Sequence, residues 1–331
     1  MLDALARAEG APAAELVRTN RIGLTAATAT DLAGFDLDAF LATLSPAASI
    51  AVRHTIGLAD PLTEADLAPA DRLNDGLPET LEEAIAAYGH RFFKLKIAGD
   101  PEADVARLAR IASVLDRLPD YRVTLDGNEQ YPDPATVAGF LDRLAAAPGL
   151  DRLRAAILFL EQPMARAVTL ATPLAVPIPV EIDEADGAIA AFPAARALGY
   201  AGVSSKSCKG FTRALLNRAR IEAAGTGFIS AEDLTTQAGI AVQQDLILAT
   251  LVGATHVERN GHHYVDGMAG APEAERAAFR AAHPDLYHGP NARLTIRDGA
   301  VSLASIAAAP GLGSAVEPDW SAMTSMMETT A

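Results

Sequence analysis

Short apolar runs alternate with longer amphipathic segments through most of the chain. Eight runs read as strands, and they cover residues 49–56, 91–97, 121–126, 155–161, 177–183, 201–206, 227–231 and 255–258. Helical periodicity fills the segments between them, most clearly at about 101–117, 134–147, 187–197, 210–224 and 237–252. This alternation predicts an α/β protein with a parallel sheet, and eight repeats favour closure into a TIM-type barrel.

Both ends of the chain depart from this rhythm. Residues 1–47 carry amphipathic and Ala-rich helical patterns that are broken near Gly10 and Pro12. After residue 258, alternating runs on either side of Asp298-Gly299 predict a β-hairpin, and residues from about 316 are expected to be frayed. Three regions follow: 1–47, a barrel at 48–258 that carries the site, and a C-terminal segment at 259–331.

Three acidic residues, Asp126, Glu161 and Asp183, each stand at the end of a separate predicted strand. In a parallel barrel these ends meet at one rim, where barrel enzymes place their chemistry. Their carboxylates are the hard oxygen ligands that Mg²⁺ prefers, with Asn128 and Glu184 as close neighbours. Each residue alone could equally be a helix cap or a salt-bridge partner, but the set of three favours a metal site.

The lysines suggest proton transfer at the same rim. Lys94 and Lys96 share one face of their strand, inside an otherwise apolar run. A like charge nearby and burial both disfavour the protonated form of Lys96, which makes it the candidate base. Lys206 ends the sixth strand, across the barrel, and suits proton delivery to the other face. Lys209 is expected in the turn into the next helix, in a secondary role.

Other residues give weaker signals. His262 and His263 follow the eighth strand and could be acid/base residues, line a substrate pocket or have no role. The stretch Ser230-Ala231-Glu232-Asp233, after the seventh strand, is a weaker rim candidate, and Asp233 is the residue singled out from it. His54, on the first strand, could be a satisfied barrel histidine or a functional one. Cys208 has no evident base, so nucleophilic catalysis is not expected.

Composition narrows the class of protein further. The chain has 331 residues, of which 50% are hydrophobic, and a formal net charge of −15, which argues against nucleic-acid and anionic-membrane partners. A single cysteine fits a reducing compartment, and neither a signal peptide nor a membrane span is evident. A cytoplasmic location is therefore expected. Ala-rich helical surfaces are compatible with a homo-oligomer.

The ordered set of motifs resembles the enolase superfamily, most closely its muconate-lactonising and mandelate-racemase-like branches. The resemblance covers about residues 48–315. Its motifs are Lys94-Leu95-Lys96, Asp126-Gly127-Asn128, Glu161-Gln162-Pro163, Asp183-Glu184, Lys206, Arg297-Asp298-Gly299 and Pro310-Gly311-Leu312-Gly313. The chain departs from the branch at Glu184-Ala185, Gly210-Phe211 and His262-His263.

The resemblance implies a (β/α)₇β barrel that binds Mg²⁺, with Mn²⁺ as an alternative, through Asp126, Glu161 and Asp183. It implies abstraction of the proton α to a substrate carboxylate, with Lys94 and the metal stabilising the enediolate. Family members carry an α+β capping domain before the barrel. Residues 1–47 are therefore expected to be linker helices and the remnant of a truncated cap, toward which the C-terminal hairpin packs back.

The expected reaction is racemisation, epimerisation or cycloisomerisation of a small carboxylate, with Lys96 and Lys206 as the acid/base pair. One alternative is an acid-sugar or hydroxy-acid dehydratase in which a rim histidine expels hydroxide. A hypothesis from another functional class is that the chain is a catalytically silent barrel that binds a small acid or a protein partner.

Overall fold

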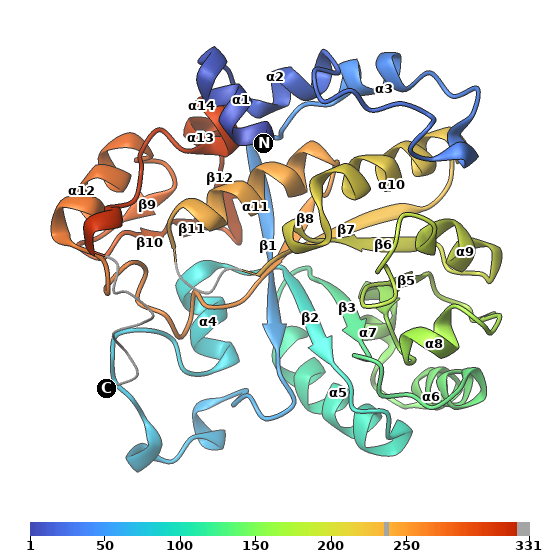
Figure 1. Ribbon diagram of the computed structural model, residues 1–331. Helices are drawn as coiled ribbons and strands as arrows, with labels where there is room; N and C mark the ends of the chain where they lie inside the picture. The colour runs from blue at the N-terminus through green and yellow to red at the C-terminus, as the bar shows by residue number, and fades with distance from the viewer. Residues whose placement is uncertain (235–237, 323–331) are drawn as a thin grey trace, which may run out of the picture.

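Eight parallel strands close into a barrel at the centre of the computed structural model, which describes residues 1–234 and 238–322 (Figure 1). Each strand pairs with the next along the chain, and β8 pairs in parallel with β1. The predicted barrel is confirmed. Its strands are β1 Ser49–Ile56, β2 Phe92–Lys96, β3 Arg122–Asp126, β4 Ile157–Glu161, β5 Val180–Ile182, β6 Gly202–Ser205, β7 Phe228–Asp233 and β8 His256–Arg259.

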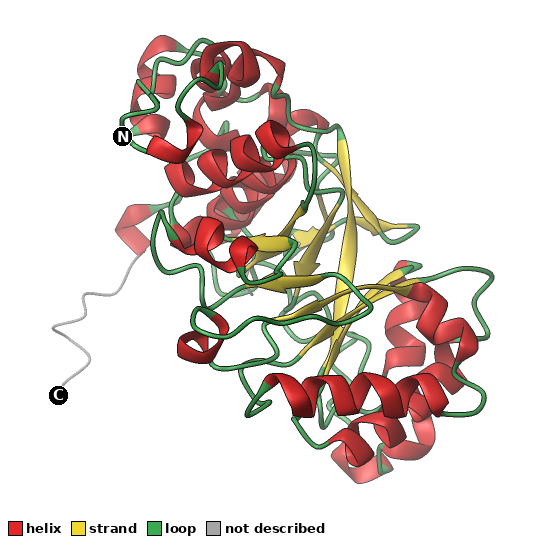
Figure 2. Ribbon diagram, turned by 90° about the vertical axis from the view of Figure 1, so that its right-hand side faces the viewer, coloured by secondary structure: helices red, strands yellow, loops and turns green. Residues whose placement is uncertain are grey.

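Helices surround the strands on the outside (Figure 2). Those between the strands are α4 Leu81–Tyr88, α5 Pro101–Leu115, α6 Pro134–Ala146, α7 Asp151–Ala156, α8 Arg166–Thr169, α9 Ala191–Ala197, α10 Phe211–Ala224 and α11 Ile240–Leu251. Local chemistry explains where several begin: Asp100 and Asp133 cap α5 and α6 through their side chains, and a proline follows each cap. The fourth strand was predicted to begin at 155, but α7 occupies that position. Residue 237, the predicted start of the helix at 237–252, lies outside the described residues.

The two ends of the chain pack onto the barrel helices. At the N-terminus, α1 Leu2–Glu9, α2 Ala13–Arg18 and α3 Leu37–Thr43 lie above α10 and α11, and Val17 and Leu41 join the apolar cluster that these helices form (Figure 1). The C-terminal elements are α12 Glu273–Ala282, β9 Tyr287–His288, β10 Arg293–Leu294, β11 Ile296–Arg297, β12 Ala300–Ser302, α13 Ala304–Ala308 and α14 Pro310–Gly313. Single 3₁₀ turns cover Thr30–Leu32, Glu64–Asp66, Pro69–Asp71, Ser207–Lys209 and Trp320–Ala322.

The hairpin predicted around Asp298-Gly299 is present. It joins β11 to β12, and β12 pairs antiparallel with the first residues of β1, so the hairpin extends the barrel sheet at that strand. Of the segment expected to be frayed, residues 323–331 lie outside the described residues. Residues 260–272, which follow β8, contain no helix, and the next helix along the chain is α12.

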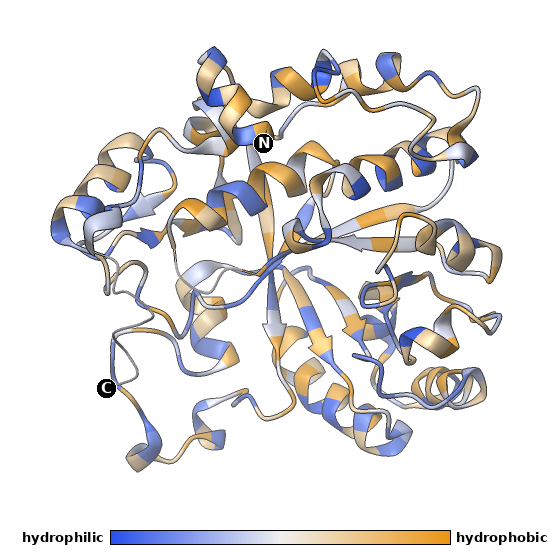
Figure 3. Cartoon of the chain, in the orientation of Figure 1, coloured by the Kyte–Doolittle hydropathy of each residue, from blue (hydrophilic) through white to orange (hydrophobic). Residues whose placement is uncertain are grey.

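Strand alternation separates a polar barrel interior from an apolar outer layer. On β2, Phe93 and Leu95 belong to the core between the strands and the helices, whereas Lys94 points into the barrel. On β1, Thr55 faces the interior and His54 packs against Phe93 on the outside. Figure 3 shows apolar and hydrophilic residues alternating along strands and helices. In the described part of the chain, no helix has the length and apolarity needed to cross a membrane.

Candidate active site

Lys94 lies at the centre of the barrel interior, and its side chain is almost completely buried. Its Nζ lies 2.7 Å from Asp126 Oδ2 and 3.0 Å from Glu161 Oε1, and it also donates to Glu258. Burial acts to lower the pKa of Lys94, but the charges of Glu161, Glu258 and Asp126 outweigh it and raise that pKa well above its usual range. Lys94 is therefore a fixed positive charge among carboxylates.

Lys96 lies nearer the rim and shares a carboxylate with Lys94. Its Nζ donates to Asp126 Oδ2 and to Asn128 Oδ1, at 2.6 Å each. The backbone N–H of Asn128 donates in turn to Asp126 Oδ1 at 2.9 Å, and its side-chain amide donates to Glu184 Oε1 at 3.4 Å. The predicted common face of the two lysines is thus confirmed, and the structure brings Asn128 and Glu184 to the same rim.

Lys206 and Lys209 converge on Asp183 at the opposite wall. Lys206 donates to Asp183 Oδ2 at 2.8 Å and forms an ion pair with Glu232. Lys209 donates to Asp183 Oδ1 at 2.7 Å and to the backbone carbonyls of Asp183 and Ser204. Burial acts to raise the pKa of Asp183, but the two ammonium groups hold it below its usual range. Lys209, expected only in a turn, therefore fixes a predicted metal ligand.

The four lysines named above are all the lysines in the chain. They stand among 27 basic residues, so every basic residue away from the site is an arginine. Arginine stays protonated in proteins, whereas the lysine ammonium can give up its proton. The chain uses lysine only where carboxylates converge, which marks these positions as chemically distinct. This signal can be read from the sequence alone.

Two further glutamates, Glu232 and Glu258, lie beside Glu161 in the interior. Single carboxylate oxygens of Glu161, Glu232 and Glu258 lie within 4.8 Å of one another. Burial acts to raise the pKa of Glu258, but the positive charges of Lys94, Arg53 and Lys96 lower it to about 2. Glu258 ends the eighth predicted strand and could have been found by the rule that identified Glu161. Glu232 lies in the stretch named as a weaker rim candidate but was not singled out, because β7 continues past the predicted end at residue 231.

Asp233, the residue singled out after the seventh strand, lies on the other face of β7. Its buried carboxylate pairs with Arg259 of β8, the residue opposite it in the sheet. Since side chains alternate along a strand, Glu232 faces the lysines and Asp233 does not. The structure therefore places Glu232 where the sequence favoured Asp233.

The carboxylates suit a hard divalent cation. Glu161 Oε2 is buried and has no hydrogen-bond partner in the described part of the chain, and the same holds for Glu184 Oε2. Burial raises the pKa of Glu161 well above its usual range, with Lys94 acting in the opposite direction. Such a carboxylate lacks sufficient positive charge around it. Glu161 belongs to the compact group with Glu232 and Glu258, whereas the oxygens of the predicted triad Asp126, Glu161 and Asp183 do not all lie within 4.8 Å of one another. Glu161 is the common member of the two ligand sets.

Gln162 positions the neighbouring strand end. Its carboxamide oxygen accepts from the backbone N–H groups of Asp183 and Ala185 at 2.9 and 3.1 Å, and its nitrogen donates to Met164 O and Thr169 Oγ1. This fully buried side chain links the residues after β4 to those after β5. It acts on the site through Asp183, as a positioning residue.

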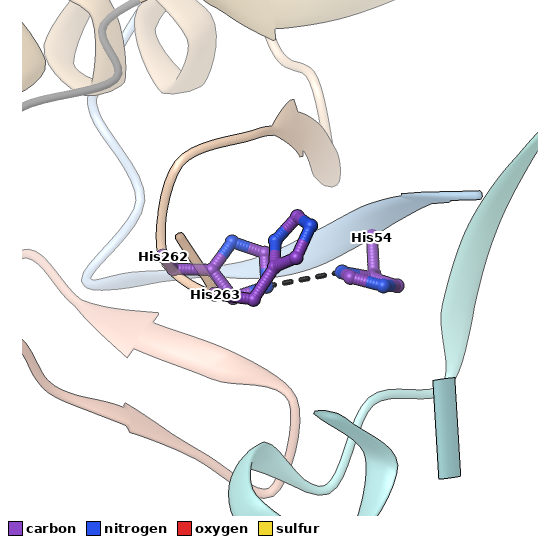
Figure 4. Close-up of side chains that lie close together, drawn as sticks. All are labelled: His54, His262 and His263. Carbon is purple, nitrogen blue, oxygen red and sulfur yellow. Dashed lines mark hydrogen bonds between the residues drawn. The ribbon is translucent and has the colours of Figure 1, made fainter. Parts of the chain in front are cut away.

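His262 and His263 do not join the lysines. They lie with His54 on the outer side of β1, as Figure 4 shows. His54 Nδ1 is 3.1 Å from His262 Nε2. This placement gives no support to a dehydratase that uses a rim histidine.

Fold and site together define a TIM-type barrel with a charged site built from the carboxyl ends of its strands. Residues 76–320 match the family model described as enolase C-terminal domain-like, and the chain belongs to this family. The resemblance to the mandelate-racemase and muconate-lactonising branch is thereby confirmed. No curated protein sequence matches the chain significantly.

Solved structures of this superfamily share the fold. An N-succinyl Arg/Lys racemase from Bacillus cereus ATCC 14579 is 16% identical, with a TM-score of 0.60 over 97% of this chain and 68% of that one. A muconate cycloisomerase from Pseudomonas fluorescens is 20% identical, with a TM-score of 0.59 over 94% and 68%. A superfamily member from Roseovarius nubinhibens ISM complexed with magnesium is 23% identical, with a TM-score of 0.57 over 97% and 68%. The chain thus spans about two thirds of the length of these proteins.

Proposed function

We propose that this protein is an enzyme that removes the proton α to a carboxylate and returns a proton to the same substrate, as a racemase, epimerase or cycloisomerase. The observation that carries the proposal is the placement of the lysines. Lys96 ends β2 and Lys206 follows β6, and in the closed order of eight strands these are opposite walls. Asp126, Glu161 and Asp183 stand at the three intervening strand ends.

Two lysines on opposite walls suit chemistry at both faces of one carbon. Lys96 would take the α proton from one face, and Lys206 would deliver a proton to the other. Burial acts to lower the pKa of Lys206, but Asp183 and Glu232 raise it above its usual range, so it starts as a proton donor. For the opposite enantiomer the two roles exchange. Lys94 keeps a permanent positive charge beside the carboxylates and does not exchange protons.

Asp126, Glu161 and Asp183 are the residues that would hold the metal, with Mg²⁺ first and Mn²⁺ as the alternative. The unpartnered oxygen of Glu161 and the hard oxygen donors fit this ion. When bound, the ion would supply positive charge beside the substrate carboxylate, where negative charge grows as the α proton leaves. Lys209 and Gln162 would keep Asp183 in place for this role.

The proposal is tested by NMR in deuterated water, where exchange of the α proton of a substrate can be measured. The candidate substrates are both enantiomers of a panel of N-succinyl amino acids, and muconate, each in the presence of Mg²⁺. The wild type is expected to exchange the α proton of one panel member and to interconvert its enantiomers. Lys96→Arg and Lys206→Arg keep the charge but cannot give up a proton. Each should abolish interconversion and should retain exchange for one enantiomer only, a different one in each variant.

If both variants lose α-proton exchange equally for both enantiomers, the lysines only bind substrate. A keto acid product would identify the dehydratase instead. A complementary measurement is thermal unfolding with and without Mg²⁺. The wild type is expected to gain stability and Glu161→Gln to gain less. Absence of both a magnesium effect and α-proton exchange across the panel would favour the catalytically silent barrel.

A further inference from the structure

Four of the seven histidines in the chain gather at one place outside the barrel. His54 lies on the outer face of β1, and His262 and His263 follow β8 (Figure 4). His90 lies two residues before the start of β2. His262 Nε2 is 3.1 Å from His54 Nδ1 and 3.0 Å from His90 Nε2. The ring centroids of His54 and His263 are 4.8 Å apart. Segments from opposite ends of the sequence therefore meet in one imidazole cluster.

Hydrogen bonds among the rings do not give every ring nitrogen of this cluster a partner. His262 Nε2 faces two other ring nitrogens, but one nitrogen offers either a single proton or a single in-plane lone pair. The Nδ1 atoms of His262 and His263 are buried and have no hydrogen-bond partner among the described residues. His54, His90 and His262 are themselves at least nine-tenths buried. Buried polar atoms normally have partners, so the unpartnered Nδ1 of His263 and the His262 Nε2 that cannot bond both of its neighbours point to a missing ligand.

The rings have the protonation state that metal binding requires. Burial lowers the pKa of His54 and His262 well below the usual range and that of His90 to about 3. Neutral imidazoles keep a free lone pair, which is the donor that transition metals take.

The distances suit a tetrahedral ion. With metal–nitrogen bonds of about 2.0–2.1 Å, neighbouring ligand nitrogens in a tetrahedral zinc site lie about 3.3 Å apart. The separation of His54 Nδ1 and His262 Nε2, 3.1 Å, is within about 0.2 Å of that value. One ring nitrogen each from His54, His262 and His263 already lies within 4.8 Å of the others.

A cavity of about 400 Å³ leads to the cluster from solvent. His54 and His263 line its inner part, and the carboxylates of Asp60, Asp71 and Asp75 also line it. The charge of Asp60 reaches His263, where it acts to raise the pKa against the effect of burial. An acidic cavity that ends at neutral imidazoles attracts a cation and offers it nitrogen ligands.

We propose that His54, His262 and His263 bind a divalent transition-metal ion, Zn²⁺ first, at a site separate from the carboxylate site inside the barrel. The ion would tie the segment after β8 to the outer face of β1. This is the seam where the last strand of the barrel meets the first, and residues 260–272 after β8 contain no helix. The site is therefore a structural clamp on barrel closure.

The two sites would select different ions. Carboxylate oxygens favour Mg²⁺, whereas imidazole nitrogens favour Zn²⁺, Co²⁺ or Ni²⁺ over Mg²⁺. This difference lets the sites be examined one at a time in the same protein. Excess Mg²⁺ occupies the carboxylates, and the added transition ion then reports on the histidines.

The experiment is a titration of the metal-free protein with Co²⁺ and with Zn²⁺ in excess Mg²⁺, followed by visible absorption and calorimetry. One equivalent is expected, with the intense visible bands of four-coordinate Co²⁺, and Zn²⁺ should displace it and raise the melting temperature. His263→Asn, which opens on the cavity and should disturb folding least, is expected to weaken binding at least about tenfold. His54→Asn should do the same. The exposed His288→Asn serves as the matched control and should leave binding unchanged.

Glu161→Gln separates the two proposals, because it removes a carboxylate of the inner site and leaves the histidines intact. It should retain the full equivalent of Co²⁺. The clamp is overturned if Co²⁺ binding is absent, if it survives His263→Asn at full affinity, or if it disappears in Glu161→Gln. Retained binding in that variant would support the clamp even where the catalytic proposal fails.

Discussion

Replacing Lys94 with Met tests whether the barrel interior is held together by one central cation. Methionine keeps the length and the apolar stem but removes the ammonium group. The carboxylates of Asp126, Glu161 and Glu258 then face one another without it, in a place that water does not reach. Removing one partner of a buried ion pair costs about 3–5 kcal/mol. We expect the free energy of unfolding to fall by an amount in this range.

Lys96→Met is the matched control, because it makes the same chemical change two residues away. The Lys96 side chain is 24% exposed and shares only Asp126 of these carboxylates. Partly exposed ion pairs contribute about 0–1 kcal/mol. Urea unfolding followed by circular dichroism, in the presence of a chelator, should therefore show a large loss for Lys94→Met and a small one for Lys96→Met, with similar m-values.

The loss should also depend on pH in a defined direction. In the wild type, Lys94 helps to lower the pKa of Glu258 from 4.5 to about 2. The ionised carboxylate of Glu258 therefore contributes fully to the free energy of unfolding at pH values above 4.5, and this contribution is lost as the pH falls toward 2. In the variant the same buried carboxylate lacks its main cation, so its pKa rises and it takes up a proton as pH falls. The gap between wild type and variant should be largest near about pH 7.5 and should shrink toward about pH 5. A gap that stays constant, or a Lys94→Met protein as stable as Lys96→Met, would refute the reasoning.

Two further predictions concern the framework of the site, and both are measured by urea unfolding. Gln162→Leu leaves the buried N–H groups of Asp183 and Ala185 without their acceptor and should cost about 2–4 kcal/mol, whereas a loss below about 1 kcal/mol would show that this link is dispensable. Gly127→Ala should cost about 1–3 kcal/mol, because a Cβ there would lie 2.6 Å from the Cα of Pro163. Gly139→Ala, within α6 and with no atom within 4 Å of the added carbon, should instead stabilise by about 0.5–1 kcal/mol. Equal effects of the two glycine substitutions would contradict the close approach at Gly127.

Much of the fold follows from the sequence, because hydrophobic periodicity and strand alternation act locally. The first strand was predicted at its observed limits, and the remaining strands to within a few residues. Errors occurred at ends where a short element lacks a clear pattern. The residues before Ile157 were assigned to a strand but form α7, and β7 runs two residues past its predicted end.

The rim of the site was also predictable, since the carboxyl ends of barrel strands meet at one place whatever their separation in sequence. The contacts between side chains inside the barrel could not be predicted from the sequence. The pairing of Lys94 with Glu258 joins residues 164 positions apart and depends on closure of β8 onto β1. From the sequence, only the like charge of the two lysines and their burial could be considered. The structure adds the carboxylates that surround Lys94 and raise its pKa.

The histidine cluster, which lies outside the barrel, could not be predicted from the sequence for the same reason. His54 and His262 are 208 residues apart, and no local periodicity connects them. What connects them is the pairing of β1 with β8, and alternation along β1 then directs Thr55 toward Glu258 inside and His54 toward His262 outside. One strand thus separates oxygen donors on its inner side from nitrogen donors on its outer side. If both sites hold metal, the selectivity of each follows from strand alternation at this seam, and a substitution at position 54 should change transition-metal binding without altering the contacts of Lys94.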